Sequence, residues 1–188
     1  MEVDRFVSDD VIIQQTSTWL QQVVIGCNFC PFAAKVVLEN KVRMRVCNSS
    51  SDETIYEILH EELDYLDSNA ECETSLLILP NTYSDFEKFY DLYLGGEVLL
   101  GQLDYDFIFQ LVSFHPAYLF VESEIDDPAN YTNRSPYPTI QILREDSIDE
   151  VLESYPDIDN IPNRNIEFAR NKGLAYMQAL LASCFGQS

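Results

Sequence analysis

Residues 75–79 form a continuous apolar run, Ser-Leu-Leu-Ile-Leu, that Pro80 and Asn81 follow directly. A short apolar run ended by turn-forming residues is typical of a β-strand that is buried on both faces. Such a strand requires a covering layer on each side, because successive side chains of a strand point to opposite faces of the sheet. The run therefore predicts a sheet with helices packed on both of its faces.

Helical and strand-like patterns alternate around this run. Residues 42–47 alternate apolar and polar side chains, as in a strand with one buried face, and residues 107–112 and 139–143 also read as strands. Residues 52–67 carry an apolar stripe at helical spacing, with most of their acidic side chains outside it. Alternation of strands and helices indicates parallel crossover units. We predict an α/β fold with a small mixed, mainly parallel sheet of about four or five strands flanked by helices.

Both ends of the chain have helical patterns. Residues 9–24 place their apolar side chains on one helical face, and Pro31 suits the first position of a second helix, with Cys30 as its N-cap. A long terminal helix is expected, with one side formed by Ile166, Gly173, Met177, Leu180 and Cys184. No segment has the composition of a linker, so we expect a single globular domain over residues 1–188 with helical N- and C-termini.

The composition restricts the partners of the chain. Its 32 acidic and 11 basic residues give a formal net charge of −21, which repels polyanions, so nucleic acid and anionic membranes are not expected partners. The same charge is also compatible with a role in solubility alone. The start of the chain lacks the pattern of a signal peptide and no apolar run is long enough to span a bilayer, so we predict a cytoplasmic protein. Five cysteines, an odd number, in a chain without an export signal indicate reduced thiols.

The densest group of chemically capable side chains lies between residues 113 and 138. His115 follows the third predicted strand directly, and ligands of open α/β sheets bind beyond the carboxyl ends of the strands. A histidine at that position can act as a general acid or base, or bind a metal ion through one nitrogen. The structural alternative is a hydrogen-bonded turn residue in front of Pro116.

Acidic and basic side chains follow in the same segment. Asp126 and Asp127 could raise each other's pKa, orient the histidine or bind a divalent cation, although Asp-Asp-Pro is also an ordinary turn sequence. Arg134 precedes prolines that favour extended backbone, which suits a bidentate clamp on a carboxylate or phosphate. A structural salt bridge is the alternative for this arginine. Asn133 and Arg144 are further candidates for substrate binding.

Cys27 and Cys30 form a single Cys-x-x-Cys pair, which is weak evidence for redox or zinc chemistry without a second pair. At a helix N-cap the pKa of Cys30 would be lowered, and its thiolate could act as a nucleophile with His115 as base. A buried, unreactive thiol is the alternative, because free cysteine is among the most buried residue types. These spacings predict no metal site.

Five stretches of the chain carry a family resemblance: Cys30-Pro31-Phe32-Ala33, Ser113-Phe114-His115-Pro116, Asp126-Asp127, Thr132-Asn133-Arg134-Ser135-Pro136-Tyr137-Pro138 and Leu143-Arg144-Glu145. Together they resemble a bacterial family, the domain-of-unknown-function family numbered 1415. The resemblance covers most of the chain but implies no assigned activity, so no catalytic role follows from it. In the family the position of Cys27 is usually apolar, so Cys27 departs from the pattern and Cys30 matches it. This departure weakens dithiol chemistry and zinc binding by paired thiolates.

Three hypotheses for the function follow from these residues. The first is an enzyme acting on a small anionic molecule, a carboxylate or phosphate, with His115 as acid or base, Asp127 as its orienter or as a cation ligand, and Arg134 holding the anion. The second is a non-catalytic module that binds a metabolite or a protein partner. The third is a thiol enzyme that uses Cys30. The sequence leaves the cofactor open, with a divalent cation as one option, and leaves the oligomeric state open as well.

Overall fold

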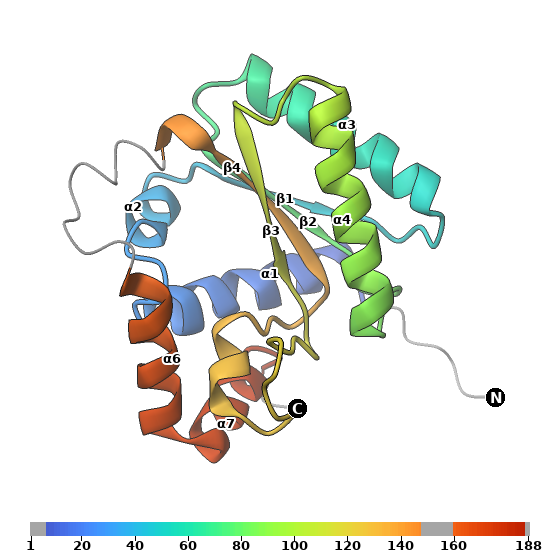
Figure 1. Cartoon of the computed structure of the whole chain (residues 1–188). Coiled ribbons are helices and arrows are strands. Elements are labelled where there is room, and N and C mark those ends of the chain that lie inside the picture. Colours follow the sequence, from blue (N-terminus) through green and yellow to red (C-terminus); the bar gives the residue numbers. More distant parts are fainter. Residues whose placement is uncertain (1–6, 148–159, 187–188) are drawn as a thin grey trace.

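A mixed β-sheet lies at the centre of the structure, a computed structural model that describes residues 7–147 and 160–186 (Figure 1). Its strands occur in the order β1-β2-β4-β3. β1 and β2 are parallel, and β4 is antiparallel to both of its neighbours. β3 therefore points in the same direction as β1 and β2 without pairing with either. The strands are β1 (Val42–Val46), β2 (Thr74–Ile78), β3 (Phe109–Phe114) and β4 (Thr139–Arg144).

The prediction of an α/β fold with a small, helix-covered sheet is confirmed, but the expectation of a mainly parallel sheet is wrong. The chain reaches β4 from β3 through a long irregular segment, and β4 then inserts between β2 and β3 in the opposite direction. Local sequence patterns report where strands occur but carry no information on the order in which they pair.

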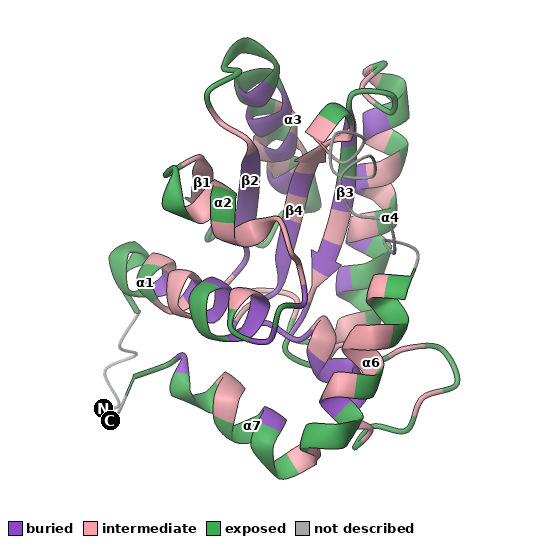
Figure 2. Cartoon of the chain, turned by 90° about the vertical axis from the view of Figure 1, so that its left-hand side faces the viewer, coloured by how far each residue is buried: buried purple, intermediate pink, exposed green. Residues whose placement is uncertain are grey.

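Helices cover both faces of the sheet (Figure 1). α3 (Asp52–Ser68) and α4 (Phe86–Gln102) pack on one face. The other face is covered by helices from both ends of the chain, and the outer surfaces of these helices are exposed while β2 is buried along its whole length (Figure 2). The elements of this second layer are α1 (Asp9–Trp19), the continuing π-helix η1 (Leu20–Ile25), α2 (Ala33–Leu38), α6 (Ile161–Lys172) and α7 (Leu174–Ser183), with the short 3-10 helix η2 (Pro128–Thr132) beside α6.

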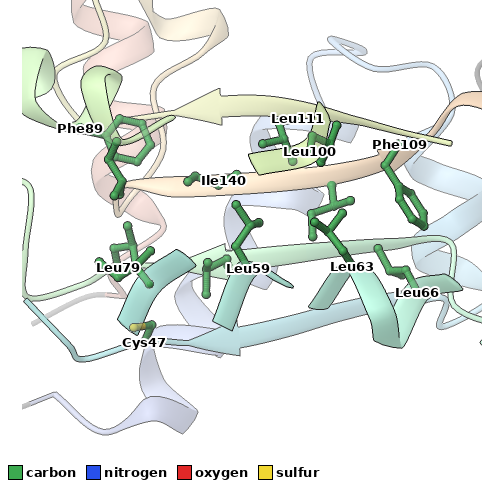
Figure 3. Close-up of a cluster of buried hydrophobic side chains, with 14 residues drawn as sticks. Cys47, Leu59, Leu63, Leu66, Leu79, Phe89, Leu100, Phe109, Leu111 and Ile140 are labelled. Carbon is green, nitrogen blue, oxygen red and sulfur yellow. The ribbon is translucent and has the colours of Figure 1, made fainter. Parts of the chain in front are cut away.

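The layer of α3 and α4 encloses the larger apolar core. Figure 3 shows Leu59, Leu63 and Leu66 of α3 in one apolar cluster with Ile140 of β4, and none of these side chains is exposed to solvent. Burial of a leucine side chain stabilises a fold by about 1.5–3 kcal/mol. The apolar stripe expected from the sequence therefore fixes α3 against the sheet and leaves the acidic face of the helix in solvent.

The opposite core joins the first helix to the polar segment after β3. The ring of Trp19 lies edge-on to Phe114, with the ring centroids 5.1 Å apart. Its indole N–H donates to the carbonyl oxygen of Arg134 at 3.0 Å. One side chain of α1 thus contacts both the end of β3 and the start of the segment that leads into β4.

Two expectations for the helices are wrong in detail. α2 begins at Ala33 with Phe32 as its N-cap, so Cys30 lies before the helix and does not cap it. The terminal helix is two helices, because Gly173 has a φ of 82°, a left-handed conformation that ends α6 before α7 begins. Within the described residues, no helix is long and apolar enough to cross a membrane.

Candidate functional site

His115 lies at the carboxyl edge of the sheet, where the sequence predicted it, and its side chain is completely buried. The ring packs between Phe86 and Phe89 of α4, with centroid distances of 5.4 and 5.1 Å. Nδ1 accepts a hydrogen bond from the N–H of Ala117 at 2.9 Å, and Nε2 lies 2.7 Å from the carbonyl oxygen of Tyr83. A carbonyl oxygen can only accept, so Nε2 carries the proton and the ring is neutral.

The environment of His115 favours this neutral form. Burial lowers the pKa of His115 below 6.5, and the nearby Arg134 acts in the same direction, while the Tyr83 carbonyl and Asp85 oppose the shift. Both ring nitrogens are already bonded to backbone groups, so in this conformation neither can reach a ligand in solvent. Proton transfer by His115 stays a prediction that requires the loop around it to open.

The hydrogen bond from His115 holds an unusual backbone conformation in place. Tyr83 has a φ of 57°, which bulky residues rarely adopt because the Cβ atom crowds the backbone. Its phenol donates a short hydrogen bond to the carboxylate of Asp52, in the first turn of α3. Burial, and then the hydrogen bond to this carboxylate, raises the pKa of Tyr83. His115 thus bonds to the backbone of a strained tyrosine whose phenol bonds to the start of α3.

Arg134 is brought close to His115, since the N–H of His115 donates to the carbonyl oxygen of Asn133. Its guanidinium nevertheless bonds within the protein. Nε donates to the Tyr118 carbonyl at 3.2 Å and Nη2 to the Ile125 carbonyl at 3.1 Å, while the group stacks on the ring of Tyr131. Arg134 therefore holds the loop that follows β3, and an anion clamp stays a prediction.

Asn130 completes the same loop, although the sequence did not single it out as a site residue. It is fully buried. Its side chain accepts from the N–H of Phe120 at 3.1 Å and donates to the carbonyl of Glu124 at 2.9 Å. The neighbouring Asn133 accepts from the hydroxyl of Thr132 at 3.0 Å. Both asparagines bond inside the segment.

Asp127 bonds away from His115. Its carboxylate accepts from the N–H of Ala129, which caps η2, and forms an ion pair with Arg170 of α6 at 2.7 Å. The Arg170 guanidinium and then the Ala129 N–H lower the pKa of Asp127 to about 2. This carboxylate ties the loop to α6, whereas Asp126 is exposed.

Arg144 is not part of this group of residues. Because β4 runs antiparallel to its neighbours, its last residue lies at the opposite edge of the sheet from His115. The guanidinium donates to the carbonyls of Leu66, Asn69 and Cys72, so it caps the end of α3. Positive charge near a helix C-terminus complements the partial negative charge there.

Cys30 is half-buried and packs against the core that the terminal helices cover, whereas the ring of His115 packs on α4. Cys27 and Cys184 are buried in the same core. Burial raises the pKa of both thiols, to about 11 for Cys184. Over residues 7–147 and 160–186, no three His, Cys, Asp or Glu side chains are grouped so that they could hold a metal ion.

A shallow depression of about 290 Å³ opens at the carboxyl edge, between the first turns of α3 and α4. It contains two carboxylates, one ammonium group and two phenols, and the backbone of one of these tyrosines, Tyr83, bonds to His115. No motif in the sequence indicated this depression, because its residues also fit ordinary helix surfaces. The rule that ligands bind beyond the carboxyl ends of strands predicted only the edge of the sheet at which it lies. The lining residues are Asp52, Tyr56, Tyr83, Lys88, Asp91 and Leu92.

The described residues thus define an α/β domain that has a small polar depression at the carboxyl edge of its sheet. A family model described as "Protein of unknown function (DUF1415)" matches residues 11–179. The chain belongs to this family, as its motifs predicted. Comparison with curated proteins and with solved structures gives no match.

Proposed function

We propose that this protein is a small-molecule-binding domain whose ligand occupies the depression between α3 and α4. The observation that carries the proposal is the composition of this depression at the ligand-binding edge of an α/β sheet. Its volume of about 290 Å³ is at the lower end of the range for ligand pockets. A metabolite of few atoms fits such a space better than a nucleotide does.

The charges around the depression support a zwitterionic ligand. Asp52 and Asp91 can accept hydrogen bonds from an ammonium group, and Lys88 can bind a carboxylate. A simple dianion would meet two carboxylates and one ammonium group, which is unfavourable on a chain of net charge −21. An α-amino acid carries both required groups at a separation that this space can hold.

The enzyme hypothesis has less support from the same geometry. Acid or base catalysis by His115 requires the ring to leave the Tyr83 carbonyl and the Ala117 N–H. Anion binding by Arg134 requires its guanidinium to leave two further carbonyls. In the binding role, His115 and Arg134 do not contact the ligand. They hold in place the loops next to the depression.

Thermal unfolding with a panel of common α-amino acids tests the proposal. A ligand present at about 100 times its Kd stabilises the folded state by about 2.7 kcal/mol. We expect at least one amino acid to raise Tm, and Asp52→Asn and Lys88→Gln each to remove the shift. Lys35→Gln, an exposed lysine on the other face of the sheet, should keep it.

Three further probes separate the possible ligand classes. Succinate and inorganic phosphate lack the ammonium group, and putrescine lacks the carboxylate. If either anion raises Tm and no amino acid does, the hypothesis of a zwitterionic ligand is refuted. No shift with any probe, or a shift that survives both pocket substitutions, would refute the site itself.

A further inference from the structure

The loop that follows β3, residues 116–127, has irregular structure and is held in place largely by polar contacts. The guanidinium of Arg134 and the side-chain amide of Asn130 each bond to its backbone at two points. Its apolar side chains contribute little burial at Val121, which is 93% exposed, and at Ile125, which is 77% exposed. Segments with few buried apolar contacts open at a lower free energy than the core does. This loop can therefore open while the sheet stays folded.

His115 holds the start of this loop by a hydrogen bond that only its neutral ring can make. Nδ1 accepts from the N–H of Ala117 at 2.9 Å. A protonated imidazole carries a hydrogen on both nitrogens, so neither nitrogen can accept. The Nδ1–H of a protonated ring would face the Ala117 N–H, and two donors cannot bond to each other. Protonation of His115 is therefore incompatible with the closed position of Ala117.

The other nitrogen of the ring bonds in the same way in both protonation states. Nε2 lies 2.7 Å from the carbonyl oxygen of Tyr83, to which the neutral and the protonated ring can both donate. Phe86 and Phe89 of α4 also pack against the ring. These contacts hold the imidazole in place when it gains a proton, so the loop that begins at Ala117 is the part that has to move.

The groups around the ring disfavour a positive charge while the loop is closed. Burial, and then the nearby guanidinium of Arg134, lowers the pKa of His115, whereas the Tyr83 carbonyl and Asp85, the N-cap of α4, act in the opposite direction. Burial raises the pKa values of the phenols of Tyr83 and Tyr118, so both stay neutral in acid. His115 is thus the group in this cluster whose charge changes just below neutral pH.

Proton uptake and opening of the loop are coupled. The side chain of His115 is completely buried, so it can take up a proton from water only when the loop has opened. A histidine in solvent has a pKa of about 6.5, which is higher than the pKa of His115 in the closed state. The open state therefore binds the proton more tightly, and acid shifts the population towards it.

We propose that residues 116–127 form a lid that opens locally in acid, because protonated His115 can no longer accept the hydrogen bond from Ala117. Opening frees Nδ1 of His115 and the guanidinium of Arg134 from the backbone of the lid. At neutral pH the lid is closed and both groups stay bonded to it. This device does not depend on the ligand proposed for the depression between α3 and α4.

Amide hydrogen exchange of the full chain, followed by NMR, tests the proposal at Ala117 and Phe120, whose N–H groups bond to His115 and Asn130. After correction for the intrinsic exchange rate, the open fraction at both amides should rise several-fold, by up to about tenfold, between about pH 7.5 and pH 5.5. Amides of the buried strand β2 should stay much better protected at both pH values, because they open only with the whole molecule. Asp127 adds to the response only below about pH 4, since its pKa is about 2 in the closed state.

Two variants assign the response to one histidine. In His115→Phe the lid amides should exchange at a level that does not change between the two pH values, whereas His60→Gln, at a partly exposed position on α3, should keep the response of the parent. If His115→Phe fails to fold, nitrogen NMR of the parent's imidazole rings replaces it, and protonated His115 should appear as the protection of Ala117 is lost. Lid exchange in the parent that does not change with pH, a response that persists in His115→Phe, or protonation of His115 without loss of protection would each overturn the proposal. Exchange of β2 as fast as that of the lid at about pH 5.5 would also overturn it, because the opening would then be global.

Discussion

His115→Phe isolates the structural role of the buried histidine. Phenylalanine can keep the packing between Phe86 and Phe89 but cannot donate to the Tyr83 carbonyl, which lies 2.7 Å from Nε2. A partly buried carbonyl left without its donor costs about 1–3 kcal/mol. Ala117 is exposed, so its N–H can bond to water instead and adds little. We therefore expect the free energy of unfolding to fall by about 1–3 kcal/mol at neutral pH.

The cost should depend on pH in a defined direction. The folded-state pKa of His115 is lower than 6.5, so the unfolded chain takes up the proton first as the pH falls. The stabilisation from neutral His115 is complete above about pH 6.5 and is lost as the pH falls from about 6.5 to below the folded-state pKa. Within this range the free energy of unfolding falls by no more than about 1.4 kcal/mol per pH unit. The difference between parent and His115→Phe should therefore shrink on acidification.

Urea denaturation followed by the fluorescence of Trp19, the only tryptophan, measures both effects, since this side chain is 1% exposed in the folded state. His60→Gln is the matched control, because His60 is partly exposed and lies 3.6 Å from Asp64 on the surface of α3. It should change stability by less than about 0.5 kcal/mol. A His115→Phe variant as stable as the parent, or a cost that is the same at about pH 7.5 and pH 5.5, would refute the structural role.

Three further predictions test other parts of the molecule. Arg170→Gln should raise the pKa of Asp127 from about 2 towards 3.8, because the guanidinium is the main cause of the lowered value, and carbon-detected NMR titration measures this shift. Gly95→Ala should displace the phenol of Tyr56, which occupies the position of the added Cβ atom, and so lower both Tm and any ligand affinity of the depression between α3 and α4. Alkylation of the native protein with iodoacetamide, read by mass spectrometry, should label the two partly buried cysteines before the three buried ones. The first group is Cys30 and Cys72, and the second is Cys27, Cys47 and Cys184.

Each of these predictions has a contrary outcome. An unchanged titration of Asp127 in Arg170→Gln would show that the ion pair is absent in solution. Gly101→Ala is the control for Gly95→Ala, because no atom lies within 4 Å of its added Cβ. Alanine has the higher helix propensity, so Gly101→Ala should not lower Tm, and a Gly95→Ala variant that also keeps or raises Tm would show that Tyr56 is not displaced. Rapid labelling of Cys184 would contradict its burial, and sparing of Cys30 at mildly acidic pH would argue against the thiol-enzyme hypothesis.

Local sequence patterns were sufficient for much of the fold. The apolar run at residues 75–79 is a fully buried central strand, and the helical stripe at residues 52–67 faces the core as expected. Both predictions depend on side-chain periodicity, which is a property of neighbouring residues alone. The direction of β4 was missed, because strand pairing joins residues that are far apart in the chain.

By itself, the sequence determined the α/β class, the family and the edge of the sheet at which His115 lies, because spacing and strand ends can be read along the chain. Only the tertiary structure decided what the polar side chains do there. His115 and Arg134 bond to backbone carbonyls whose positions depend on the path of the folded loops. The depression between α3 and α4 likewise draws its residues from two helices and a loop, and such groups meet only when the chain has folded. A polar side chain in a sequence has many possible partners, and folding selects among them by bringing distant backbone groups within hydrogen-bonding distance.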